Sequence, residues 1–282
     1  MNSVKPRPSD SDEREQLEIE MLLVAMFKLY GYDFRNYAYA SIRRRIWHRV
    51  HAERLTTITS LTDRVIHDRG CMERLLSDLT IHVTEMFRDP EVFKSFRKNV
   101  VPLLKTYPFI RIWHAGCSTG EEVYSMAILL HEEGLYDRTR IYATDMSSTV
   151  LDVARQGVFP IERMQQYTRN YQDGGGKESF SDYYTAKYES VIFQSFLKKN
   201  IVFAQHNLVT DGSFNEFHVI LCRNVMIYFN KDLQNHVHGL LYDSLSMFGV
   251  LLLGTKESIN FTRHADQFDE LDLINRIYRK VK

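Results

Sequence analysis

The sequence is poor in cysteine and carries no net charge. Its three cysteines, Cys71, Cys117 and Cys222, lie far apart in a chain of 282 residues, so we expect neither a disulfide framework nor a metal site. The 36 basic and 36 acidic residues balance, which argues against nucleic acid as a partner. No apolar run approaches the roughly 20 residues that span a membrane, and the first residues do not resemble a signal peptide. We therefore expect a cytoplasmic protein without membrane insertion.

The sequence also lacks the usual glycine patterns of nucleotide sites, although it has their element order. Ile110–Trp113 is a short run of bulky, β-forming residues that is followed by the small residues 115–120. Apolar residues at helical spacing then begin at Val123. This order predicts the first half of a nucleotide-binding unit, in which Gly116 lets the backbone approach a ligand closely. Gly116 and Gly120 do not form G-x-G-x-x-G, which argues against an NAD-dependent oxidoreductase, and no lysine follows Gly120 as a P-loop requires.

Two carboxylates open the predicted helix. Glu121 and Glu122 suit the positive end of a helix dipole, but they would repel a phosphate and attract a cationic group. A ligand with an adenosine half and a positively charged amino-acid half fits these features, and S-adenosylmethionine is such a ligand. The alternative is that both acids only stabilise the first helical turn, and the loop by itself favours neither interpretation.

Four blocks of sequence resemble the CheR family, the chemotaxis-receptor glutamate methyltransferases. They are Thr84–Arg88, Ala115–Glu122, Ala143–Asp145 and Cys222–Phe229, and they span most of the chain from about Leu79 onward. The resemblance implies an α/β fold: a class I, Rossmann-like S-adenosylmethionine-dependent methyltransferase domain, with a small all-helical N-terminal domain and a small antiparallel β insertion. It implies methyl transfer from S-adenosylmethionine, which leaves S-adenosylhomocysteine, to glutamate carboxylates of chemoreceptors for sensory adaptation.

The resemblance also implies site residues. Arg88 and Tyr228 would be catalytic, and the cofactor would be bound by His82, Thr84, Arg88, Gly116, Glu122, Asp145, Asn207, Leu208, Arg223 and Asn224. His82 stands where the family commonly has Asn. Asp145 ends the predicted strand Thr139–Thr144, where an acid can accept both ribose hydroxyls, although it could instead cap the next helix.

The predicted strand Phe217–Cys222 is almost wholly apolar, so we expect it to be buried on both faces. Arg223 and Asn224 would then emerge at its carboxyl end beside the glycine loop, where open α/β sheets bind ligands. A helix over Lys231–Met247 and a strand over Gly249–Leu253 are expected to follow. The loop Gly254–Ser258 departs from the family's usual G-H-S-E-S, and we assign it no role.

Residues 1–12 are expected to be a disordered lead-in, residues 13–90 a helical domain and residues 91–282 the methyltransferase domain. In the helical domain, Ile42, Ile46 and Val50 predict an amphipathic helix whose other side is basic. This basic side is either an ordinary solvent-exposed face or a surface that binds an acidic partner. The resemblance implies the second, a contact with the receptor's methylation region, and the predicted receptor-binding residues are Arg43, Arg44, Arg45 and Arg49.

Residues 157–200 interrupt the alternation of strands and helices. We expect an insertion with a small antiparallel sheet whose turn is formed by Gly174–Gly176. Its many tyrosines either form its own core or belong to a surface that binds a receptor tail peptide at a strand edge. The chain is expected to act as a monomer. The alternative function is a catalytically weak S-adenosylmethionine-binding module of a chemosensory pathway.

Overall fold

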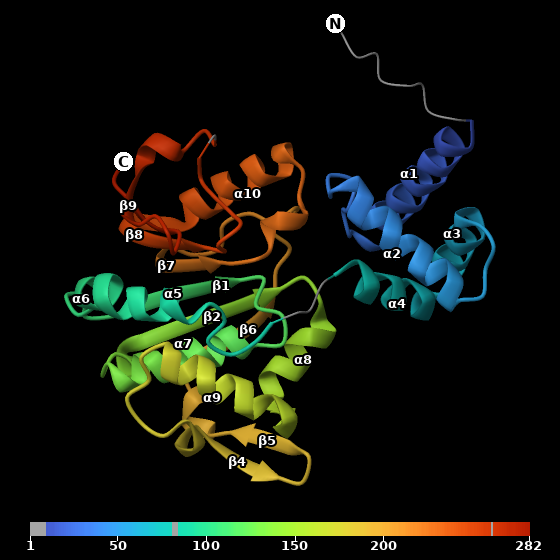
Figure 1. Ribbon diagram of the computed structural model, residues 1–282. Helices are drawn as coiled ribbons and strands as arrows, with labels where there is room; N and C mark the ends of the chain where they lie inside the picture. The colour runs from blue at the N-terminus through green and yellow to red at the C-terminus, as the bar shows by residue number, and fades with distance from the viewer. Residues whose placement is uncertain (1–9, 81–83, 261) are drawn as a thin grey trace, which may run out of the picture. The chain divides into compact units, whose positions relative to one another are not determined.

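The computed structural model describes residues 10–80, 84–260 and 262–282 (Figure 1). It divides into two compact units. The helical unit comprises residues 10–80 and Tyr228–Leu233, and the sheet unit comprises residues 84–227 and Gln234–Lys282. The domain boundaries given above stay predictions. None of the helices in the described part of the chain is long and apolar enough to cross a membrane.

The helical unit is built on amphipathic helices with local caps. Its helices are α1 (Asp10–Tyr30), α2 (Tyr39–Ala52), α3 (Ile58–His67) and α4 (Arg69–Leu79). The side chain of Thr57 accepts a hydrogen bond from Ser60 N and so caps α3, and Asp68 caps α4 through Gly70 N. Helix α1 begins at Asp10, two residues before the end of the predicted lead-in 1–12. Acidic residues there suit the first turn of a helix.

The sheet unit contains a mixed sheet in the order β6-β2-β1-β7-β8-β10-β9. Its strands are β1 (Ile110–Ala115), β2 (Thr139–Asp145), β6 (Ile201–Gln205), β7 (Phe217–Cys222), β8 (Leu245–Leu253), β9 (Phe268–Asp272) and β10 (Ile277–Lys280). The strands from β6 to β8 pair in parallel, whereas β10 is antiparallel to both of its neighbours. Strand β7 lies between β1 and β8 and is buried at all positions except the half-buried His218. The predicted Rossmann-like α/β fold is confirmed.

Helices pack on both faces of this sheet, with α7 and α8 on one side and α10 on the other (Figure 1). The helices are α5 (Pro90–Ser95), a π-helical turn (Phe96–Val100), α6 (Val101–Leu104), α7 (Glu121–Glu132), α8 (Ser148–Gln156), α9 (Met164–Asp173) and α10 (Lys231–Ser244). Helix α10 ends three residues before the predicted Met247. Leu245 already pairs with Phe217 of β7, so its backbone joins the sheet ladder rather than a further helical turn.

The insertion contains the predicted small sheet, in the order β3-β5-β4. Its strands β3 (Val158–Pro160), β4 (Tyr184–Lys187) and β5 (Ser190–Phe193) pair antiparallel. The prediction that Gly174–Gly176 forms the hairpin turn is wrong. Gly174 N and Gly176 N bond to carbonyls of α9, and Gly175 has φ +78°, so the glycines end that helix. Tyr188 and Glu189 connect β4 to β5.

The insertion is bonded to the end of α7 through a buried carboxylate. The side chain of Glu132, the last residue of α7, is 1% exposed. It accepts hydrogen bonds from the hydroxyls of Tyr171 and Tyr183 and from the backbone N–H of Lys177. Tyr167, Tyr171 and Tyr183 are all buried. These three tyrosines therefore belong to the core, which was one of the two interpretations of the aromatic residues.

Candidate functional site

Three neighbouring parallel strands end at the same edge of the sheet. Strand β1 leads into the loop 116–120, β2 ends at Asp145, and β7 is followed by Arg223 and Asn224. Because β1 pairs in parallel with both β2 and β7, the residues after these strands meet at one edge. This is the edge at which open α/β sheets bind ligands.

The loop after β1 is packed too tightly for most side chains. Gly116 has φ +79°, and a Cβ atom there would lie 2.6 Å from Cγ2 of Val225. The amides of Gly116 and Cys117 both donate to the carbonyl of Thr144 at 2.9 and 2.8 Å, which holds the loop against the end of β2. Gly116 thus brings the loop into contact with the turn after β7, where a side chain would keep the two apart.

Asp145 connects this loop to the start of α8. Its Oδ2 accepts a hydrogen bond from Ser118 N at 2.9 Å, and its Oδ1 accepts one from Ser147 N at 3.0 Å. The second bond closes a local turn just before α8, and because Ser147 is itself the N-cap residue of that helix, Asp145 does not cap it. The first bond places the carboxylate beside the glycine loop, where the predicted ribose contact requires it.

Replacing Asp145 by alanine is expected to weaken binding of S-adenosylhomocysteine by roughly 1.5–3 kcal/mol, because the ribose hydroxyls lose a charged acceptor. Isothermal titration calorimetry measures this loss, and Asp145→Asn, which keeps one acceptor oxygen, should lie between alanine and wild type. Asp152→Ala is the control, because Asp152 is an exposed acid of α8 that pairs with Arg155. A folded Asp145→Ala variant with wild-type affinity would contradict the ribose assignment.

Arg223 connects the helix after the glycine loop to the segment 84–89. Its Nη1 donates to Oε2 of Glu122 at 2.6 Å, and its Nη2 donates to Oδ2 of Asp89 at 2.7 Å and to the carbonyl of Arg88 at 3.2 Å. The Arg223 side chain is 1% exposed. Burial by itself would raise the pKa of Glu122, but Arg223 and His114 outweigh it and lower that pKa to about 2. The cationic group that Glu122 attracts within the described residues is therefore Arg223.

The segment 84–89 is held in a strained conformation. Phe87 and Asp89 have φ values of +50° and +56°, which non-glycine residues rarely adopt. Phe87 N donates to the hydroxyl of Ser125 in α7, and Met86 O accepts from Asn170 in α9. These bonds fix the backbone that carries Thr84 and Arg88. The predicted contact of His82 lies outside the described residues.

Two buried polar atoms near the loop are available to a ligand. Within the described residues, neither Asn224 Oδ1 nor Ser118 Oγ has a hydrogen-bond partner, and such atoms are rare in folded proteins unless something else satisfies them. Asn207 instead uses its side-chain oxygen to accept from Val209 N, and Leu208 is buried. The glycine cradle, the Asp145 carboxylate and these two atoms fit a polar ligand with a sugar.

Sequence reasoning missed two residues at this edge. Asp89 was not among the predicted site residues, but it pairs with Arg223. Glu257 lies in the loop to which no role was assigned, and its carboxylate accepts four backbone hydrogen bonds. The glutamate of G-T-K-E-S stands where the family motif G-H-S-E-S also has one, and this was the available signal. Among the described residues, no group of three or more His, Cys, Asp or Glu could hold a metal ion.

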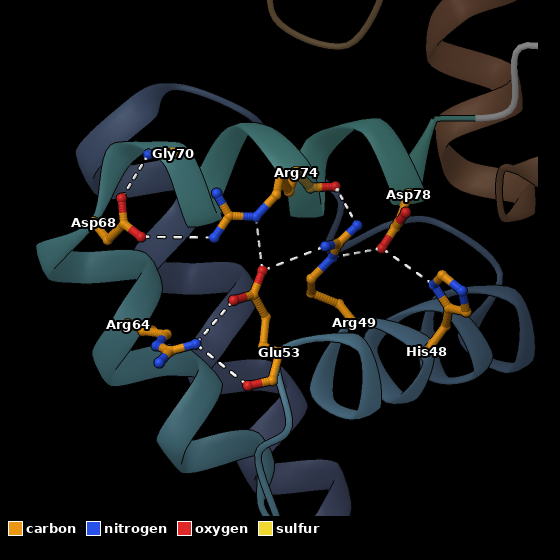
Figure 2. Close-up of polar contacts among 8 residues, drawn as sticks. All are labelled: His48, Arg49, Glu53, Arg64, Asp68, Gly70, Arg74 and Asp78. Atoms are coloured by element: carbon orange, nitrogen blue, oxygen red, sulfur yellow. Dashed lines mark hydrogen bonds and ion pairs between the residues drawn. The ribbon is translucent and has the colours of Figure 1, made fainter.

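In the helical unit, three of the four predicted receptor-binding arginines, Arg43, Arg45 and Arg49, have partners inside the unit. Figure 2 shows Arg49, whose Nε donates to Asp78 at 2.7 Å and whose Nη1 donates to Glu53 at 3.3 Å. Glu53 is in turn bound by Arg64 and Arg74 (Figure 2). The Arg49 side chain is only 12% exposed, so it connects α2 to α4.

Arg45 is also turned toward its own unit, whereas Arg43 and Arg44 are exposed. Arg45 donates to the carbonyl of Leu79 at 2.7 Å, and its guanidinium lies 5.5 Å from the ring centroid of Tyr228. Arg43 pairs with Glu15 but keeps half of its side chain exposed. The exposed charge of α2 therefore comes mainly from Arg43 and Arg44. The catalytic role of Tyr228 stays a prediction.

Comparison with known proteins agrees with this architecture. The family model of the CheR methyltransferase all-alpha domain matches residues 17–80 of the sequence. The family model of the CheR methyltransferase SAM binding domain matches residues 82–276. The protein named putative methyltransferase Cher3 of Pseudomonas putida is 50% identical over 96% of this chain and 99% of its own length.

More distant relatives carry a more specific name. The chemotaxis protein methyltransferase of Listeria monocytogenes is 28% identical over 81% of this chain and 85% of its own. Chemotaxis protein methyltransferase 2 of Pseudomonas aeruginosa is 30% identical over 85% of both chains. Because the two family models match residues 17–80 and 82–276, the chain belongs to the CheR methyltransferase family and its cofactor is S-adenosylmethionine.

Proposed function

We propose that this protein methylates the side-chain carboxylates of glutamate residues in the cytoplasmic part of chemoreceptors, giving methyl esters for sensory adaptation. It acts in the cytoplasm as a monomer. Relatives that are named chemotaxis protein methyltransferases support this function.

The reaction requires the glutamate carboxylate to be aligned with the methyl group, and it does not require a general base. A glutamate side chain has an ordinary pKa of about 4.3, so it is already a nucleophile at neutral pH. S-adenosylmethionine, when bound, supplies an electrophilic methyl group. Arg88 offers a planar set of donors that matches a carboxylate and holds the acceptor in line, and such positioning contributes about 7–11 kcal/mol in well-oriented reactions.

The observation that carries the proposal is the set of contacts made by Arg223. Its Nη1 is bonded to Glu122, in the first turn after the glycine loop, and its Nη2 is bonded to the carbonyl of Arg88. The backbone of Arg88, the residue proposed to hold the acceptor carboxylate, is therefore fixed to the helix that begins at the cofactor loop. This arrangement supports a site in which cofactor and carboxylate are aligned on one framework.

A methyl-transfer assay tests the proposal. The purified protein is incubated with tritiated S-adenosylmethionine and receptor cytoplasmic fragments, and the product is treated with alkali. We expect label that alkali releases as methanol, as an ester requires, and none on fragments in which the candidate glutamates are replaced by glutamine. Binding of S-adenosylhomocysteine without any transfer would favour a cofactor-binding module instead, and alkali-stable label would indicate a different acceptor.

Receptor binding is expected to involve the exposed arginines of α2. Arg44→Glu should weaken receptor binding by up to about fivefold, as an exposed charge pair contributes roughly 0.2–1 kcal/mol, and added salt should reduce the effect. Cofactor affinity should stay unchanged. Surface plasmon resonance with receptor fragments at two salt concentrations measures this.

Arg49→Glu serves as the comparison, because it places a carboxylate beside Asp78 and Glu53. We expect this variant to lower the melting temperature, whereas Arg44→Glu should not. Equal loss of stability in both variants, or a salt-independent loss of receptor binding, would contradict a role for the exposed face.

A receptor tail peptide is further proposed to bind at β4, which is an edge strand of the small sheet.

A further inference from the structure

The loop after β8 carries a buried carboxylate with an unusual set of partners. Glu257 is 5% exposed. Its Oε2 accepts from Gly254 N at 2.7 Å and from Asn224 N at 2.8 Å, and its Oε1 accepts from Val225 N at 2.9 Å and from Met226 N at 2.7 Å. Four donors on two oxygens match an ionised carboxylate, which only accepts.

Three of these donors form the turn that follows β7, and this turn has little room to move. Asn224 has φ +62°, so its conformation is one that must be held in place. On one side, Val225 fills the space that a Cβ at Gly116 would occupy. On the other, a Cβ at Gly254 would lie 2.8 Å from Asn224 N. Because these three N–H groups bond to Glu257, a single side chain provides the acceptors that the turn requires.

The turn presents an unsatisfied acceptor at the cofactor edge. Asn224 Oδ1 is buried and has no partner in the described ranges 10–80, 84–260 and 262–282. An oxygen of this kind accepts a hydrogen bond from an N–H donor. S-adenosylmethionine has two such groups, the adenine amine and the ammonium of its amino-acid half.

We infer that Glu257 is a positioning residue of the cofactor site. Its carboxylate fixes the backbone of residues 224–226, so that Asn224 Oδ1 accepts a hydrogen bond from an N–H donor of S-adenosylmethionine. Glu257 itself does not touch the ligand. This role concerns cofactor binding and is independent of the methyl acceptor.

Glu257→Gln tests the inference with almost no change in shape. In either orientation, the amide nitrogen of the glutamine faces two of the four backbone N–H groups, so two hydrogen bonds become contacts between donors. We expect the dissociation constant for S-adenosylhomocysteine to rise about ten- to hundredfold, measured by calorimetry on the full chain. Glu257→Asp, which keeps a carboxylate, should retain more affinity than Glu257→Gln. If the glutamine variant does not fold, the affinity of Glu257→Asp is compared with that of wild type instead.

Glu132→Gln is the matched control for the loss of a buried charge. Glu132 is also a buried, multiply bonded glutamate of the sheet unit, but it ends α7, about 16 Å along the helix from the loop. We expect this variant to melt at a lower temperature and yet to bind S-adenosylhomocysteine as wild type does. Equal losses of affinity in both variants would overturn the inference, since they would reflect general destabilisation.

A double-mutant cycle tests whether Glu257 acts through Asn224. In an Asn224→Ala background, Glu257→Gln should change the affinity less than twofold, and additive losses would overturn the inference. Methylthioadenosine, which has the adenine amine but no ammonium, identifies the donor. A loss of affinity with both ligands assigns the adenine amine, and a loss with S-adenosylhomocysteine only assigns the ammonium. Wild-type affinity of Glu257→Gln for both ligands would also overturn the inference.

Discussion

Replacing Arg88 by alanine is expected to lower methyl transfer at saturating cofactor by about a hundred- to a thousandfold, the usual cost of removing a pre-organised hydrogen-bond donor from an active site. The guanidinium would hold the acceptor carboxylate with one oxygen directed at the methyl group. Its loss should appear in kcat, whereas the affinity for S-adenosylhomocysteine should fall much less. Single-turnover assays with receptor fragments, combined with calorimetry, separate the two quantities.

Two further variants make this expectation specific. Arg88→Lys keeps the positive charge but loses the planar set of donors, so it should recover only part of the rate. Tyr228→Phe keeps the ring next to the Arg45 guanidinium and removes only the hydroxyl that we expect to orient the acceptor, so it should lower turnover without loss of stability. Unchanged turnover in both Arg88→Ala and Tyr228→Phe would remove this pair from the active site.

Replacing Arg223 by alanine is expected to destabilise the protein by about 3–5 kcal/mol, because the variant leaves the carboxylates of Glu122 and Asp89 without their buried partner. Urea denaturation followed by circular dichroism measures this loss. Arg155→Ala is the control, since Arg155 forms an exposed pair with Asp152 and should cost less than about 1 kcal/mol. Similar losses in the two variants would contradict the role of Arg223 as a buried connection.

The pH dependence of stability provides a second check on Arg223. The folded-state pKa of Glu122, about 2, lies below its ordinary value of 4.5. The unfolded state therefore binds a proton first, and the stabilisation is fully present above pH 4.5 and is lost as the pH falls toward 2. In Arg223→Ala the main cause of the lowered pKa is gone. The slope of stability against pH in this range should decrease.

Sequence patterns predicted the features that depend on neighbouring residues. The apolar run Phe217–Cys222 is a buried central strand, as its composition indicates. Small residues after β1 form the tight loop, and the residues after β1, β2 and β7 share one edge. Because parallel strands all end at the same edge of a sheet, residues that follow different strands in the sequence come together at one place in the fold.

Features that depend on distant partners could not be predicted in this way. A one-sided cluster of arginines looks the same whether it faces solvent or, like Arg49, pairs with Asp78 of another helix. The glycines 174–176 suit a hairpin as well as a helix end, and only the packing of α9 decides between them. The glutamate of G-T-K-E-S matched the family motif, but the role of Glu257 could not be predicted because its partners are backbone N–H groups, which have no signature in the sequence.

The buried glutamate at the end of α7 has a consequence for modularity. An insertion that folds by itself can be exchanged between relatives, and the exchange changes specificity without lowering the stability of the domain that carries it. Here Tyr171 and Tyr183 of the insertion share the carboxylate of Glu132, so excising residues 157–200 would leave this buried carboxylate paired with Arg97 but without the two hydroxyl donors. A chimaera that imports another small sheet must therefore supply donors in place of those two hydroxyls, because Glu132 stays buried beside Arg97.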